Sequence, residues 1–84
     1  MGEEKIGLIG HVWKRAGTAS VDLVAGSLHV GDRIRIRGHG HDFEQVVESM
    51  EVEHVAAEEG RQGQLVAIAF SEPVHERDEV WRVR

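Results

Sequence analysis

The sequence lacks cysteine, and it has no long hydrophobic run. Without cysteine, disulfides, zinc ribbons, iron–sulfur clusters and thiol nucleophiles are excluded. No apolar stretch approaches the roughly 20 residues of a membrane-spanning helix. The beginning of the chain, Met1-Gly2-Glu3-Glu4-Lys5, does not show the basic and then apolar pattern of a secretory signal. We therefore expect a cytoplasmic protein that does not insert into a membrane.

Sequence motifs of catalysis are also missing. There is no G-x-x-x-x-G-K-[ST] loop to hold nucleotide phosphates. No serine or threonine stands in a G-x-S-x-G or S-x-x-K pattern. Paired carboxylates occur only in runs such as Glu58-Glu59, which are typical of a solvated turn. We predict that the chain is not an enzyme, has no catalytic residues and binds no nucleotide or other cofactor.

Glycine and the single proline divide the sequence into short stretches rich in valine and isoleucine, as in all-β proteins. The clearest strand is Arg33-Ile34-Arg35-Ile36-Arg37, because its two Ile face one side and its three Arg face the other. Six such strands follow one another at intervals of about 8 to 12 residues. The pattern predicts an all-β fold with a single domain, residues 1–84, built as a six-stranded closed antiparallel β-barrel with Greek-key connections.

Local signals add detail to this barrel. Gly7 and Gly10 are expected to bend or bulge the first strand. Residues 43–54 are expected to form one long strand with a bulge near Glu48-Ser49, because the apolar residues change parity there. Residues 58–63 are rich in charge and glycine and are expected to form a polar turn.

The segment Gly26-Ser27-Leu28-His29-Val30-Gly31-Asp32-Arg33-Ile34-Arg35-Ile36 resembles the second, β-barrel domain of translational GTPases such as elongation factor Tu. The resemblance continues in the strand Val47 to Val52, in the turn Glu59-Gly60-Arg61-Gln62-Gly63 and in the closing turn Val74 to Asp78. It covers about Lys5 to Val83 and implies a barrel of the translation-factor domain 2 type without its GTPase. The chain is also similar to translation elongation factor-like proteins, and a related barrel resembles the C-terminal appendage of collagenase-like peptidases.

Three arginines on one strand form the candidate RNA-binding face. Arg33, Arg35 and Arg37 lie about 6.6 Å apart, near the phosphate spacing of an extended single strand, and arginine binds phosphate through two hydrogen bonds. The alternative is that these arginines form cross-strand ion pairs with the glutamates of the adjacent strand, which are Glu44, Glu48, Glu51 and Glu53. Because the net charge is −5, any RNA contact is limited to a local patch.

The resemblance implies one more RNA contact. In elongation factor Tu, an acidic residue after the strand bulge lies beside the terminal adenosine of tRNA, and the matching position here is Glu51. An adenine pocket also needs an apolar wall, for which Leu65 or Val66 is available. The alternative is that Glu51 is simply exposed to solvent, as most glutamates are.

The loop sequence His39-x-His41-Asp42 has a spacing at which two imidazoles and a carboxylate can meet a metal ion. Its glycine-rich loop is mobile, and no second ligand pair follows at zinc-ligand spacing. We therefore predict no metal site. The remaining histidines are scattered along the chain and are expected either at the polar surface or as hydrogen-bonding residues at the ends of the barrel; they are His11, His29, His54 and His75.

Two functions follow from these patterns. The first is a translation-type binding module that contacts tRNA or ribosomal RNA through the three arginines and the glutamate named above. The alternative is a protein-interaction barrel that acts in trans on a partner such as a collagenase-like peptidase or a ribosomal component. Trp13 and Trp81 are expected to be neighbours if the terminal strands pair, and an exposed tryptophan would indicate a stacking or partner contact.

Overall fold

The computed structural model describes residues 2–84; Met1, which the predicted domain includes, lies outside this range. The strands are β1 (Glu3–Trp13), β2 (Thr18–Leu23), β3 (Ser27–His29), β4 (Arg33–Gly38), β5 (His41–Val46), β6 (Met50–Val52), β7 (Val55–Ala56), β8 (Glu59–Arg61), β9 (Val66–Ala69) and β10 (Glu79–Val83). The all-β prediction is confirmed, although ten strands stand where six were predicted. The described part of the chain contains no helix with the length and apolarity to cross a lipid bilayer.

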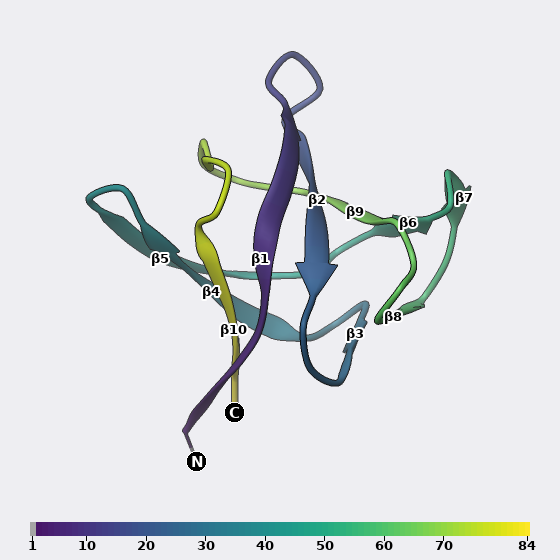
Figure 1. The fold of residues 1–84 in the computed structure, drawn as a ribbon, viewed down its shortest axis with the longest axis horizontal. Helices are drawn as coiled ribbons and strands as arrows, with labels where there is room; N and C mark the ends of the chain where they lie inside the picture. Colours follow the sequence, from purple (N-terminus) through teal and green to yellow (C-terminus); the bar gives the residue numbers. More distant parts are fainter. Residues whose placement is uncertain (1) are drawn as a thin grey trace.

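Eight strands form one antiparallel sheet in the order β5-β4-β10-β1-β2-β9-β6-β7, and β3 and β8 form a second, two-stranded sheet. In Figure 1, β1, β2 and β10 run nearly vertically, whereas β9 and β6 run nearly horizontally. The two ends of the chain lie together, because Arg84 donates its backbone N–H to the Gly2 carbonyl at 3.0 Å. The turn at residues 14–17 lies at the opposite end of the view.

The predicted closure of the barrel is not seen as strand pairing among residues 2–84, since β5 and β7 are the edges of the large sheet. A side chain spans part of the opening instead. The amide of Gln45 on β5 donates to the Ala69 carbonyl at 2.9 Å and accepts from the Ser71 backbone N–H at 2.8 Å. One edge strand is thereby tied to the end of β9.

The core follows the predicted alternation of each strand. In β4, Ile34 and Ile36 are fully buried, whereas the arginines that alternate with them face outward. In β9, Val66 and Ile68 are buried in the same way. Leu28 on the short strand β3 adds a fully buried side chain to this cluster. The predicted bulges are confirmed too, because the pairing of β1 shifts register between Lys5 and Gly7 and between Ile9 and Val12.

Two local predictions are wrong. Residues 43–54 form separate strands: β5 pairs with β4, and β6 pairs with β9. Between them Val47 is buried, and its backbone N–H and carbonyl are bonded to the carbonyl of Asp32 and the N–H of Gly31, both at 2.8 Å. The chain therefore crosses to a new partner strand instead of bulging. Residues 58–63 are not only a turn, because β8 pairs with β3 there.

Candidate functional site

The two inner arginines of the predicted RNA face share two carboxylates. Arg35 donates from Nε to Asp42 at 2.7 Å and is also ion-paired with Glu3 of β1. Arg37 lies 3.2 Å from the same Glu3 and 3.4 Å from Asp42. These four side chains form one ion-pair network on the outer face of the sheet. The alternative interpretation predicted that the arginines would be ion-paired in this way. The partners of Arg35 and Arg37, however, are Glu3 and Asp42; of the four predicted glutamates only Glu44 is paired, in the part of the chain that the structure describes, with one of the arginines, Arg33.

The other candidate RNA contacts lie apart from this network. Arg33 is mostly exposed and lies 3.6 Å from Glu44. Glu51 is on β6, which is separated from β4 by four strands in the order of the sheet, although it does share a hollow with Leu65, one of its two predicted apolar neighbours. The geometry does not test RNA binding, which stays a prediction; phosphates at Arg35 would have to displace carboxylates already bound there.

The ion-pair network predicts a depressed pKa at Asp42. Arg35 donates a hydrogen bond to this carboxylate, and this bond and the nearby positive charges outweigh desolvation and hold its pKa below the ordinary value. A carbon-13 NMR titration should place its midpoint below about 3.9. A carboxyl with a lowered pKa stabilises the fold above its ordinary pKa, and this contribution is lost as the pH falls through the lowered value.

Two variants check the cause of this shift. In Arg35→Gln the Asp42 midpoint should rise toward the ordinary value, whereas Arg33→Gln, a matched change on the same strand, should leave it in place because Arg33 pairs with Glu44. An unchanged Asp42 midpoint in Arg35→Gln would show that the network does not set this pKa.

The two tryptophans are not neighbours, although the terminal strands do pair as predicted. Trp81 lies opposite Lys5 in the pairing of β1 with β10, and the Arg37 guanidinium stands over its ring at 5.3 Å. Trp13 is at the far end of β1, opposite Thr18. Its side chain is 37% exposed and borders two surface hollows of about 510 and 440 Å³. The prediction failed because the length of β1 separates the two rings.

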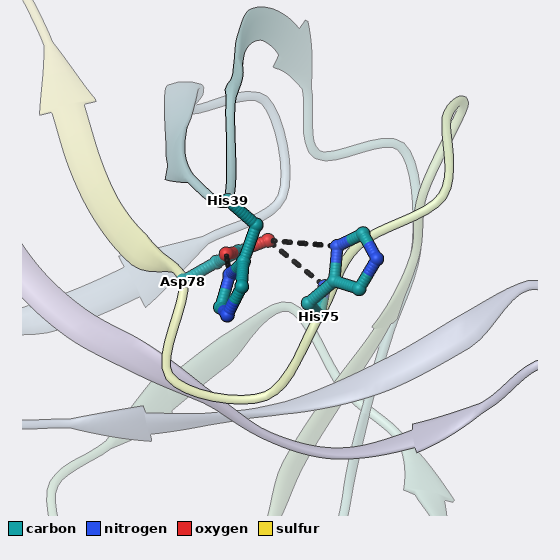
Figure 2. A group of neighbouring side chains, drawn as sticks. All are labelled: His39, His75 and Asp78. Atoms are coloured by element: carbon teal, nitrogen blue, oxygen red, sulfur yellow. Dashed lines mark hydrogen bonds and ion pairs between the residues drawn. The ribbon is translucent and has the colours of Figure 1, made fainter.

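The most unusual group of side chains surrounds Asp78, whose side chain is fully buried. His39 Nδ1 lies 2.5 Å from Oδ1, and His41 Nε2 lies 2.7 Å from Oδ2. The backbone N–H of His75 donates to Oδ2 at 2.8 Å, and the His75 ring lies beside the carboxylate with Nδ1 at 3.9 Å. Figure 2 shows the His39 and His75 rings next to the Asp78 carboxylate, and the centroids of these two rings are 5.0 Å apart.

Strand pairing brings these residues together. His39 lies in the turn between β4 and β5, and His41 is the first residue of β5. Asp78 directly precedes β10, which pairs with β4 so that Arg37 faces Glu79. Gly38 makes the close approach possible. Its φ is 149°, and a Cβ at this position would overlap the Asp78 carboxylate. The turn therefore needs glycine both for its backbone and for the space that Asp78 occupies.

Asp78 remains ionised in this setting. Burial by itself raises the pKa of the Asp78 carboxyl, but hydrogen bonds from His39, from the His75 backbone N–H and from His41 outweigh burial and hold the pKa below the ordinary value. Among residues 2–84 every ion-pair partner of Asp78 is a histidine. The cluster is thus a buried anion that has imidazoles, and no lysine or arginine, beside it.

The loop prediction found two members of this cluster but assigned the wrong carboxylate. Asp42 turns to Arg35, whereas Asp78, far along the chain, receives His39 and His41. His75 was expected at the polar surface or as a hydrogen-bonding residue at the end of the barrel, but not as a neighbour of His39 and His41, and it completes the group. The error arose because the sequence argument considered only neighbours in the loop.

A signal in the sequence could have identified the turn. The pattern apolar–His–x–x–Asp–x–apolar occurs in residues 28–34 and again in residues 74–80. In both copies the Asp carboxylate accepts from the His backbone N–H, at 2.9 and 2.8 Å, and the Asp N–H donates to the His carbonyl at 3.1 Å. The two copies precede β4 and β10, which are paired strands. Only the second copy gathers further histidines.

The fold is that of a small antiparallel β-domain known from a larger protein. It is similar to the C-terminal domain of a Geobacillus thermoleovorans protein assigned to the U32 peptidases, with 20% sequence identity and a TM-score of 0.86 over 96% of this chain and 93% of that domain. The selenomethionine variant of the same domain gives 22% identity and a TM-score of 0.83 over 92% and 96%. No protein-family model and no curated protein matches the chain.

The resemblance to elongation factor Tu and to translation elongation factor-like proteins is therefore wrong. The similar solved structures are a peptidase C-terminal domain, and no family model supports a translation factor. The motifs that suggested it are explained by the fold. The Val-Gly-Asp turn is the first of the two His–x–x–Asp turns, and the Glu-Gly-Arg segment is β8, which pairs with β3.

Proposed function

We propose that the chain is a non-catalytic accessory domain that binds a peptidase of the collagenase-like U32 kind. The observation that carries the proposal is the extent of the structural match, which takes in 96% of this chain and 93% of a domain that such a protein carries at its C-terminus. The side chains agree with a binding role. Among residues 2–84 no serine or threonine hydroxyl is hydrogen-bonded to a histidine side chain, as a hydroxyl nucleophile and its base would be.

The surface around Trp13 is where we place the peptidase. Trp13 stands between the two hollows, and the larger one is lined mainly by small and apolar side chains, among them Ala56, Leu65 and Ala67. Val55 on the edge strand β7 directly precedes Ala56 in the chain and is 66% exposed. Tryptophan is enriched among the residues that anchor protein interfaces.

Calorimetric titration tests the proposal. The chain is titrated into a U32 peptidase from the organism that encodes it, prepared with and without the peptidase's own C-terminal domain. We expect a one-to-one complex with the shortened peptidase. Trp13→Ala should weaken this complex on the order of 30-fold, because the loss of a central interface tryptophan costs about 2 kcal/mol.

Trp81→Ala is the matched control. Trp81 pairs with Lys5 at the end of β1 that is far from Trp13, and it lies beside Arg37. It should leave the affinity within about twofold, since residues outside an interface contribute little. No complex at tens of micromolar of either peptidase form would contradict the proposed function. A complex that Trp13→Ala leaves unchanged would keep the function and contradict only the surface.

A further inference from the structure

The proposed accessory function gives no role to the cluster of histidines around Asp78. Two imidazoles and a carboxylate, from His39, His75 and Asp78, each offer one ligand atom, and these atoms all lie within 4.8 Å of one another. We propose that these three residues bind a divalent first-row transition-metal ion such as Zn²⁺. This inference is independent of the proposed function.

The ligand types and spacing fit such an ion. Zn²⁺ takes nitrogen and oxygen ligands at about 2.0–2.2 Å, so two ligand atoms of a tetrahedral site lie about 3.3 Å apart. His39 Nδ1 and Asp78 Oδ1 are 2.5 Å apart, so these two atoms must separate by about 0.8 Å to admit the ion. The His75 ring must approach by about 1.5 Å to close the remaining gap from 4.8 Å. It is free to do so, because its side chain is 54% exposed.

Binding requires that the proton on His39 Nδ1 leave that atom. Nδ1 faces the Asp78 carboxylate, which only accepts, so Nδ1 carries the shared proton in the metal-free arrangement. If that imidazole carries its proton on Nε2 instead, the Nδ1 lone pair is available to the metal. The ion then stands between Nδ1 and Oδ1, where the shared proton lies in the metal-free arrangement.

The surroundings hold the carboxylate in a position to coordinate. Oδ2 of Asp78 accepts from His41 Nε2 at 2.7 Å and from the His75 backbone N–H at 2.8 Å, which leaves Oδ1 to face the ion. Hydrogen bonds of this kind orient metal ligands in many proteins. The His41 ring is itself packed edge-on against Phe43, with ring centroids 5.9 Å apart. The charge also favours a cation, because only histidines accompany this buried anion among residues 2–84.

Three protein ligands leave one coordination position to solvent. The His39 and His75 side chains are 52% and 54% exposed, so the open position faces water. Sites with three protein ligands and an open position bind water or an external donor, whereas purely structural zinc sites have four protein ligands. The site therefore belongs to the open class.

The experiment is a titration of the tag-free, chelator-treated chain with Zn²⁺ by calorimetry and with Co²⁺ by visible absorption, at neutral pH. We expect one ion per chain, and histidine-detected NMR should show the His39 and His75 rings responding. His75→Ala removes a ligand but keeps the backbone hydrogen bond to Asp78, so the fold should persist while the affinity falls at least about tenfold. His75→Phe, which keeps the ring volume, should have the same effect.

His29→Ala is the matched control. His29 occupies the same turn as His75, with its backbone N–H bonded to Asp32 at 2.9 Å and its ring 3.8 Å from that carboxylate, but its turn gathers no other histidine. The affinity of the His29→Ala variant for Zn²⁺ should stay within about twofold of that of the unmodified chain. The proposal is overturned if Zn²⁺ does not bind in the micromolar range, if both His75 variants bind it as the unmodified chain does, or if His29→Ala loses it equally.

Discussion

Replacing Asp78 with alanine is expected to lower the free energy of unfolding by about 3 kcal/mol, because three hydrogen bonds to one charged group are lost together. The backbone N–H of His75 and the Nε2 of His41 lose their acceptor, and the turn before β10 loses its link to the turn between β4 and β5. The variant also leaves a void where the fully buried side chain stood. Urea unfolding followed by circular dichroism would measure the change.

Glu76→Ala is the control for this variant, since it removes a carboxylate from the same turn at an exposed position. It should change the free energy of unfolding by no more than about 0.5 kcal/mol. If Asp78→Ala were as mild as Glu76→Ala, the histidine cluster would not hold the two turns together, and our description of Asp78 as their shared acceptor would fail.

Leu28→Ala is expected to have an effect of similar size for a different reason. Leu28 is fully buried and faces Gly60 across the pairing of β3 with β8. Gly60 leaves no space for a side chain, because a Cβ there would lie 2.5 Å from a Val66 methyl group. The surroundings therefore cannot easily fill the cavity that alanine leaves, and we expect a loss of about 3 kcal/mol.

The measurement for Leu28→Ala is the urea midpoint at constant slope, which separates lost stability from a changed unfolded state. Val30→Ala lies two residues away in the same turn and is 38% exposed, so it should lower the stability by less than about 1 kcal/mol. Equal effects of the two variants would mean that the small β3–β8 sheet is not part of the main core.

Much of the fold could be predicted because alternation is a local property of a strand. The fully buried pair Ile34 and Ile36, between outward arginines, was predicted from the period-two pattern alone. The register shifts in β1 were predicted from its glycines. The separation of β5 from β6 was not, because it depends on Val47 bonding to the turn at Gly31 and Asp32, which is distant in sequence.

The candidate site was harder to predict, since its residues come together only through the pairing of β4 with β10. From the loop sequence alone, His39 and His41 were identified but were paired with Asp42, which in the structure is ion-paired with Arg35. Asp78 lies 37 residues beyond His41, and nothing in its own segment shows that it is buried. The family resemblance failed for a related reason: short turn motifs such as Val-Gly-Asp are dictated by local hydrogen bonding and recur in β-proteins of different function.

The proposed function is that this chain binds a U32 peptidase, and its shared fold leads us to expect that it takes the place of that peptidase's own C-terminal domain. Analytical ultracentrifugation of the chain with two forms of a U32 peptidase, full-length and lacking the C-terminal domain, tests this most directly. We predict a one-to-one complex with the shortened form, little binding to the full-length form, and displacement of the chain by an excess of the isolated C-terminal domain, whose fold it shares. Equal binding to both forms would contradict the replacement of the C-terminal domain, and binding to neither form would contradict the proposed function itself.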